Sequence, residues 1–233
     1  MKHKLKIVDI REESDKTKTY LLEKPIELNW DEGSHTHIAH SGYDDGEFPN
    51  KNLVRHMSIM TLNQENLLGF TTRLNDKPSE FKRRLAELNI GDDLIVFKLG
   101  SRMRLRRENK SIVLLSMGVG IATMRPLIKT FLEDNSKIPH LININVDNTN
   151  SHVYQSELDA SETSNYHNYW TKSRVEFYQT LTNTINDNHS IFYIVGSDLF
   201  LRTVIKKLKS LGIKLDDIVI DKKDGILQLY YEF

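Results

Sequence analysis

The sequence predicts two domains, an N-terminal antiparallel β-barrel and a C-terminal α/β domain with a parallel sheet. Up to residue 99, short strand-like runs alternate with turns, and a single helix interrupts them. After Arg107, apolar strands alternate with amphipathic helices, which indicates parallel pairing because the crossover helices must pack on the sheet. The polar segment 107–110 separates the two patterns. We therefore expect domains at 1–108 and 109–233.

In the predicted barrel, the strands are the six runs that combine β-forming residues with flanking turn residues. They are 4–10, 19–25, 34–40, 54–62, 67–74 and 93–99. Ser79 can cap a helix over 79–88, in which Phe81, Leu85 and Leu88 recur at helical spacing. Several short strands with one helix are typical of a small barrel.

The predicted α/β domain has strands at 111–117, 140–146, 190–196 and 216–222 within a five-stranded parallel sheet, and helices at 121–134, 173–187 and 199–212. The segment 147–172 is rich in Asn, Ser and Thr, so we expect loops there around one short helix at 154–160.

Composition restricts the possible functions. The 233 residues are 39% hydrophobic and 27% charged, which is typical of a folded, soluble protein with an ample core. Thirty-two Lys and Arg residues balance 32 Asp and Glu residues, which argues against a nucleic-acid partner. The absence of cysteine excludes disulfides, thiolate nucleophiles and Cys-ligated clusters in this chain. Any redox activity would need another carrier.

Neither a membrane span nor a secretory signal is expected. The longest nearly apolar run, 112–117, is far shorter than the roughly 20 residues that cross a bilayer. The N-terminal segment 1–16 carries charges where a signal peptide needs an apolar stretch. These features predict a cytoplasmic protein.

Two glycine-containing turns are the strongest chemical features. The strand 111–117 runs into Gly118 and Gly120, and a helix follows at once. Such a turn lets backbone N–H groups and the helix dipole face an anion, although an ordinary tight turn also needs glycine. A third glycine and a GK[ST] sequence are missing, which excludes a Rossmann dehydrogenase fingerprint and a P-loop. Gly196 and Ser197 end another strand, and the shared carboxyl edge favours a nucleotide site.

Five motifs in order make nearly the whole chain similar to the flavodoxin/ferredoxin-NADP reductase family. VRHMSI (54–59) resembles the R-x-Y-S strand that holds the flavin, and KPSEFKRRLAELNIGDDL (77–94) resembles the S-x-x-L helix with its G-D turn. MGVGIATMRPLI (117–128) resembles the G-x-G-x-T-P nucleotide loop. VYQSELDA (153–160) is similar to the F-x-x-E-L helix, and YIVGSDLFLRTVIKKLKSLGI (193–213) to the C-G-P-x-x-(F/M) segment beneath the nicotinamide.

The resemblance implies a role for specific residues. Arg55 would pair with the FAD pyrophosphate, Ser58 would act near flavin N5 as the catalytic residue, and Ser79 would face the pyrophosphate. Ser173 and Arg174 lie where many members bind the 2'-phosphate of NADP, although Arg174 could instead be a surface residue at a helix start. The implied FAD-binding residues are Arg55, His56, Met57, Ser58, Pro78 and Ser79. The implied nucleotide-binding residues are Gly118, Gly120, Ile121, Ala122, Thr123, Ser173, Arg174, Gly196 and Ser197.

The function implied by the resemblance is that of a FAD-dependent NAD(P)H oxidoreductase. Hydride would pass from nicotinamide C4 to flavin N5, and electrons would leave to a flavodoxin or ferredoxin-type carrier or to a small acceptor. The alternative is a non-catalytic flavin- or nucleotide-binding module with the same fold, because Met57 replaces the stacking tyrosine and Ala122 and Thr123 replace the T-P step. A methyltransferase or other transferase would explain the glycine turn and none of the barrel motifs.

Two further clusters have simpler interpretations. Arg102, Arg104 and Arg106 would share one strand face, which is either solvated or a docking patch for an acidic electron carrier. His35, His37 and His40 lie on one predicted strand, and His35 and His37 share a face of it without an acidic ligand nearby in sequence. There we expect an ordinary exposed strand and no metal site.

Overall fold

The computed structural model describes residues 1–149, 151–185 and 189–232, and the chain divides into two units, Met1–Ser101 and Arg102–Phe233. The N-terminal unit is an antiparallel barrel, and the C-terminal unit is a parallel sheet covered by helices, as the sequence predicts. No helix in the described part of the chain is long and apolar enough to cross a bilayer.

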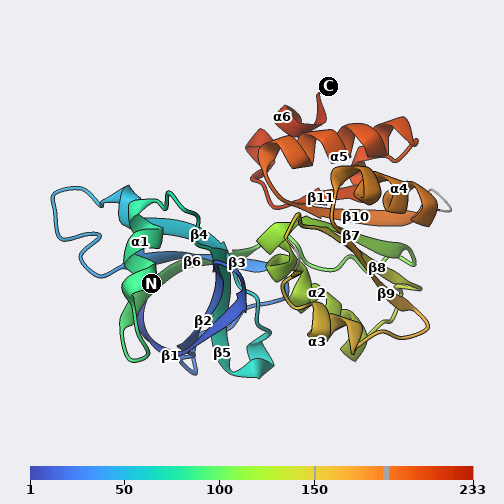
Figure 1. The fold of residues 1–233 in the computed structure, drawn as a ribbon. Coiled ribbons are helices and arrows are strands. Elements are labelled where there is room, and N and C mark those ends of the chain that lie inside the picture. Colours follow the sequence, from blue (N-terminus) through green and yellow to red (C-terminus); the bar gives the residue numbers. More distant parts are fainter. Residues whose placement is uncertain (150, 186–188, 233) are drawn as a thin grey trace. The chain divides into compact units, whose positions relative to one another are not determined.

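Six antiparallel strands form the barrel in the order β4-β3-β6-β1-β2-β5. Figure 1 shows this sheet curling around one core, with α1 beside it. All six strands lie where the sequence places them, although the predicted strand 54–62 ends as a strand at Ser58. Their bounds are β1 (Lys2–Ser14), β2 (Thr17–Glu23), β3 (Ser34–His40), β4 (Val54–Ser58), β5 (Leu67–Arg73) and β6 (Asp93–Ser101).

The segment after β4 returns to β5 and joins the two ends of the sheet. The Met60 backbone N–H donates to Gly69 O at 2.8 Å, and the Gly69 N–H donates to Thr61 Oγ1 at 3.0 Å. A Cβ on Gly69 would lie 2.7 Å from Met60 Sδ and 2.8 Å from a methyl group of Leu21. Glycine at this position therefore permits the close approach that closes the barrel.

The helix α1 (Glu80–Glu87) begins at the N-cap Ser79, and its Phe81 and Leu85 side chains enter the barrel core. Two buried side chains bond its backbone. His40 Nε2 donates to Phe81 O at 2.9 Å, and the Tyr20 hydroxyl donates to Leu85 O at 3.1 Å. These contacts hold both the start and the end of α1 against the barrel.

The expectation of an exposed histidine strand is wrong for His35 and His40, which are 7% and 5% exposed. The reason is that β3 is an inner strand between β4 and β6, and that the His40 ring packs 4.8 Å from the Phe81 ring of α1. The His35 ring lies 4.2 Å from the His56 ring across the β3–β4 pair. Among the described residues, no group of His, Asp and Glu side chains is arranged to hold a metal ion.

The C-terminal sheet has the order β11-β10-β7-β8-β9, and every pair in it is parallel. In Figure 1, α4 and α5 cover one face of this sheet, and α2 and α3 lie on the other. The strands are β7 (Ser111–Met117), β8 (Leu141–Val146), β9 (Tyr166–Thr171), β10 (Ser190–Val195) and β11 (Ile218–Ile220). The helices are α2 (Ile121–Glu133), α3 (Gln155–Asp159), α4 (Arg174–Thr184), α5 (Asp198–Ser210) and α6 (Gln228–Tyr231).

Three segments of this unit differ from the prediction. The fifth strand, β9, lies in the segment expected as loops, because its aromatic and threonine residues form a strand within an Asn-rich surrounding. The helix expected over 173–187 ends at Thr184, and positions 186 and 187 are outside the described residues. The segment 102–107 alternates buried and exposed side chains without forming a strand, and Arg106 in it pairs with Glu108 at 2.7 Å.

Candidate functional site

The N-terminal unit places Arg55 at the start of α1. Its Nη1 donates to Val54 O at 2.6 Å, and its guanidinium carbon lies 5.7 Å from the ring centroid of Phe81, in the first turn of α1. Ser79 caps this helix with extended backbone angles, and its hydroxyl makes no capping hydrogen bond to the helix. The fold thus brings Arg55, on β4, to the N-terminus of α1, where the Ser79 hydroxyl is not used for capping.

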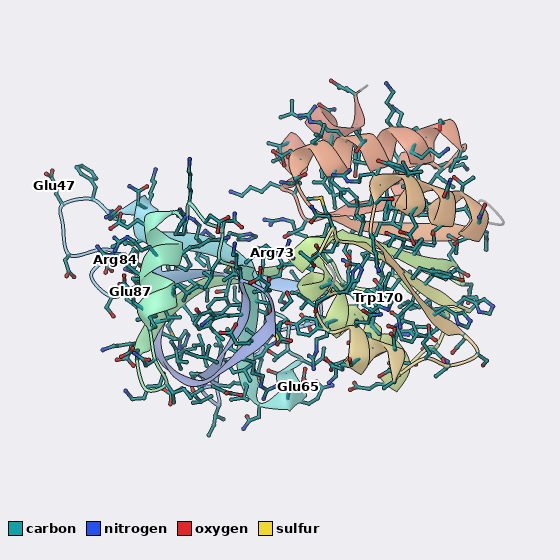
Figure 2. The ribbon with its side chains drawn as sticks, viewed as in Figure 1. Glu47, Glu65, Arg73, Arg84, Glu87 and Trp170 are labelled. Carbon is teal, nitrogen blue, oxygen red and sulfur yellow. The ribbon has the colours of Figure 1, made fainter. Side chains whose placement is uncertain are left out.

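Two more cations, Arg73 and Lys82, lie at the same place. Lys82 Nζ donates to the backbone oxygen of Arg73 at 2.5 Å, and Figure 2 labels Arg73, the last residue of β5. Burial, followed by the positive charges of Arg55 and Arg73, lowers the pKa of the Lys82 ammonium. We call Arg55, Arg73, Lys82 and Ser79 the α1 cationic cluster.

The α1 cationic cluster fits a doubly charged phosphate group. In the described part of the chain, neither Arg55 nor Lys82 forms an ion pair with a carboxylate. A lysine in the first turn also opposes the helix dipole, which favours acidic side chains there. Like charges held together at a helix N-terminus are stabilised by a bound anion. The cluster can therefore hold the pyrophosphate of a dinucleotide.

Sequence reasoning missed Arg73 and Lys82. The signal for Lys82 was present, because a cation in the third position of a predicted helix works against the dipole. No comparable signal existed for Arg73. Only the strand order reveals that the end of β5 lies near Lys82.

The remaining predicted flavin residues lie along β4 or before α1. Met57 is half-buried and packs against the barrel core, on the same strand face as Arg55. His56 is exposed and Ser58 is half-buried, and both alternate to the other face. Pro78 is exposed immediately before the N-cap of α1.

In the C-terminal unit, Gly118–Gly120 form one turn of 3₁₀ helix between β7 and α2. Gly118 has φ of 55°, a left-handed conformation that favours glycine. A Cβ on Gly120 would lie 3.0 Å from Val195 O, so the turn lies against the end of β10.

The N-terminus of α2 is open to an anion. It has no side-chain cap and no acidic residue in its first turn. The side chains of Ile121, Ala122 and Thr123 are at most 3% exposed, so these residues would contact a ligand through their backbone. Unsatisfied N–H groups of a first helical turn, aligned with the helix dipole, bind phosphates.

The second glycine turn is adjacent to the first, because β10 pairs with β7. A Cβ on Gly196 would lie 2.5 Å from Phe200 Cδ1 and 3.3 Å from Met117 Cβ. Ser197 caps α5 by accepting from the Phe200 N–H at 3.3 Å. The sequence-predicted Gly196 and Ser197 therefore lie beside the end of β7.

Ser173 and Arg174 lie at the same edge of the sheet. Ser173 Oγ accepts from the Glu176 N–H at 3.1 Å, which leaves its own hydrogen available to donate. Arg174 is half-buried, with Nη2 3.2 Å from Met117 Sδ and its guanidinium 4.9 Å from the Phe200 ring centroid. Because the strands are parallel, the nine predicted nucleotide residues all follow carboxyl ends of strands.

No protein-family model matches this chain, and no curated protein sequence matches it significantly. Solved structures match over almost the full length. The FAD/NAD-binding domain of nitric oxide dioxygenase from Vibrio cholerae is 17% identical with a TM-score of 0.76, and the match covers 94% of this chain and 97% of that one.

Two other solved structures with this fold are of a reductase and of a siderophore-interacting protein. A ferredoxin NADP+ reductase from Neisseria gonorrhoeae, solved with bound FAD and NADP, is 13% identical with a TM-score of 0.79, covering 94% of this chain and 98% of that one. A siderophore-interacting protein from Acinetobacter baumannii is 9% identical with a TM-score of 0.77, covering 98% and 95%. The chain thus has the fold of ferredoxin reductase-like FAD/NAD-binding domains, which confirms the resemblance seen in the sequence.

Proposed function

We propose that this protein binds FAD and NAD(P)H and is an NAD(P)H-dependent flavin oxidoreductase. The α1 cationic cluster carries the proposal, because positive side chains gathered at one helix start favour a polyanionic ligand, and neither Arg55 nor Lys82 pairs with a carboxylate in the described part of the chain. The same fold holds FAD and NADP in the Neisseria reductase. The barrel, within residues 1–108, would bind FAD, and residues 109–233 would bind the nicotinamide nucleotide.

In the proposed mechanism, the protein binds and orients two cofactors, and bound FAD supplies the two-electron chemistry with the nicotinamide. Arg55 would hold the pyrophosphate, and Arg73 and Lys82 would add positive charge beside it. Met57 offers a thioether surface where a ring can rest. Ser58 would offer its hydroxyl to the reacting end of the flavin.

The nucleotide is held by the second set of residues. Backbone N–H groups at Gly118–Gly120 and the start of α2 bind its phosphates. Ser173 and Arg174 bind the 2'-phosphate of NADPH, and the segment from Gly196 to Ser197 supports the nicotinamide. The electron acceptor would be a flavodoxin or ferredoxin-type carrier or a small molecule, since matched proteins of this fold include a ferredoxin reductase and a siderophore-interacting protein.

A second candidate is a non-catalytic FAD-binding module. It is favoured by Met57, because this side chain packs against the barrel core instead of presenting an aromatic ring to a flavin. Such a protein would keep the α1 cationic cluster and bind FAD without reducing it.

One experiment separates these functions. The purified protein is incubated with FAD, freed of excess cofactor by gel filtration, and mixed anaerobically with NADPH while the flavin absorbance is followed. We expect FAD to elute with the protein and NADPH to bleach it. Retained FAD that NADPH fails to bleach would identify the non-catalytic module, and failure to retain FAD would refute both candidates.

We expect the enzyme to prefer NADPH to NADH. Arg174→Ala should lower the ratio of kcat/KM for NADPH to kcat/KM for NADH about tenfold. This factor corresponds to roughly 1.4 kcal/mol of binding free energy, which is the size expected when a half-buried arginine loses one charge-assisted contact. Steady-state kcat/KM for both nucleotides measures it. Arg202→Ala is the control, because Arg202 also stacks on an aromatic ring, 5.1 Å from Tyr230, on the helix α5. Unchanged kcat/KM ratios in Arg174→Ala would refute the assignment.

A further inference from the structure

A buried side-chain amide on the neighbouring strand forms a hydrogen bond to the turn Gly118–Gly120. Asn145, on β8, is 1% exposed. Its Nδ2 donates to Ser116 Oγ at 2.8 Å and to Gly118 O at 3.2 Å. Gly118 O also accepts the backbone N–H of Ile121. Two donors therefore hold this carbonyl oxygen within the protein.

His152 determines which way the Asn145 amide points. Its Nδ1 lies 2.8 Å from Asn145 Oδ1, and the His152 side chain is 7% exposed. Because Oδ1 can only accept, Nδ1 carries the hydrogen and donates it. A flipped amide would place Oδ1 against the Gly118 carbonyl oxygen, and two acceptors would then face each other. The ring of His152 lies 5.3 Å from that of Trp170, which belongs to β9. Figure 2 labels Trp170.

The position of the Gly118 carbonyl matters for an anion site. A carbonyl oxygen that turned toward a bound phosphate would repel it, whereas preorganised N–H groups attract it. Gly118 has φ of 55°, and glycine has little intrinsic preference between this conformation and others. The Asn145 side chain adds a second restraint on this carbonyl to the one that the Ile121 N–H supplies.

We propose that Asn145, oriented by His152, is a positioning residue that holds the Gly118–Gly120 turn in its phosphate-binding conformation. The inference rests on the proposed binding of NAD(P)H at this turn. It assigns a role to two residues that do not themselves contact the nucleotide.

Asn143 provides a matched control on the same strand. It lies two residues before Asn145 and so on the same face of β8, and it is 0% exposed. Its Nδ2 donates to Asn168 Oδ1 at 3.0 Å, away from the glycine turn. Alanine at either position removes a buried amide from β8, but only Asn145 bonds the turn.

The test is NADP+ binding to the full chain, measured by calorimetry without turnover, in Asn145→Ala and Asn143→Ala. Both variants should have lower melting temperatures, because each loses a buried hydrogen bond. Only Asn145→Ala should weaken NADP+ binding, by roughly threefold to tenfold, which corresponds to loss of one ordinary hydrogen bond. FAD affinity should not change in either variant.

A second pair of variants leaves β8 intact. His152→Asn keeps a donor near the Nδ1 position and should preserve NADP+ affinity, whereas His152→Leu removes the donor and should reproduce the loss. If the wild type binds NADP+ and all four variants bind it equally well, the positioning role is overturned and the proposed function stands. If the wild type binds neither NADP+ nor NADPH, the positioning role and the proposed function are both overturned.

Discussion

Replacing Arg55 by alanine is expected to weaken FAD binding by roughly tenfold to a hundredfold, because a charge-assisted contact is worth about 1.5 to 3 kcal/mol. The guanidinium is available for a pyrophosphate, since it forms no ion pair with a carboxylate in the described part of the chain and bonds only backbone oxygens at 2.6 to 3.4 Å. The FAD affinity of Arg55→Lys should lie between that of the wild type and that of Arg55→Ala, because lysine keeps the charge but cannot bind a pyrophosphate bidentately. Fluorescence titration with FAD measures the effect.

Arg83→Ala is the matched control for Arg55→Ala. Arg83 is an exposed arginine of α1, the helix whose first turn Arg55 contacts from β4, and it pairs with Glu87 at 3.5 Å, one turn further along. Its loss should leave the FAD dissociation constant unchanged. A thermal shift gives a second readout, because added FAD should raise the melting temperature of Arg83→Ala by more than that of Arg55→Ala. Equal FAD affinity in both variants would show that β4 does not bind the pyrophosphate.

The fold could be predicted wherever local patterns determine it. The six barrel strands follow from alternating residues bounded by turns, and each was placed within a few residues of its bounds. β9 was missed because its sequence, YHNYWT, lies between polar loops and has no apolar run. Its burial comes from Tyr166, which is 0% exposed and packs only once β8 is beside it. That contact is tertiary, so a local pattern does not contain it.

The candidate site divides in the same way. Gly118 could be found from sequence because its φ of 55° is a local backbone requirement that selects glycine. The convergence of Arg55, Arg73 and Lys82 depends on three elements meeting, and the Asn145–His152 pair depends on a loop folding back onto β8. Sequence motifs identify positions where the backbone needs an unusual conformation. Side chains that act together across strands become visible only with the strand order.

Replacing Gly196 by alanine is expected to weaken NADP+ binding by roughly tenfold to a hundredfold. The new Cβ would lie 2.5 Å from Phe200 Cδ1, and Phe200 is 0% exposed against Phe177 and beneath Arg174. Overpacking of this kind costs about 1 to 3 kcal/mol. Since the ring has no free space, the strain should displace the backbone after β10 together with Arg174.

Gly225→Ala is the control for Gly196→Ala, because a Cβ on Gly225 would meet no atom within 4 Å. Calorimetric titration of NADP+ and FAD into both variants distinguishes a local effect from general destabilisation. FAD affinity should remain that of the wild type in both, because Gly196 belongs to the C-terminal unit and the α1 cationic cluster to the N-terminal one. If Gly196→Ala binds NADP+ as tightly as Gly225→Ala, the turn at the end of β10 does not contact the nucleotide. The phosphates would then be held by the Gly118–Gly120 turn and the start of α2 alone, and the nicotinamide would lie elsewhere.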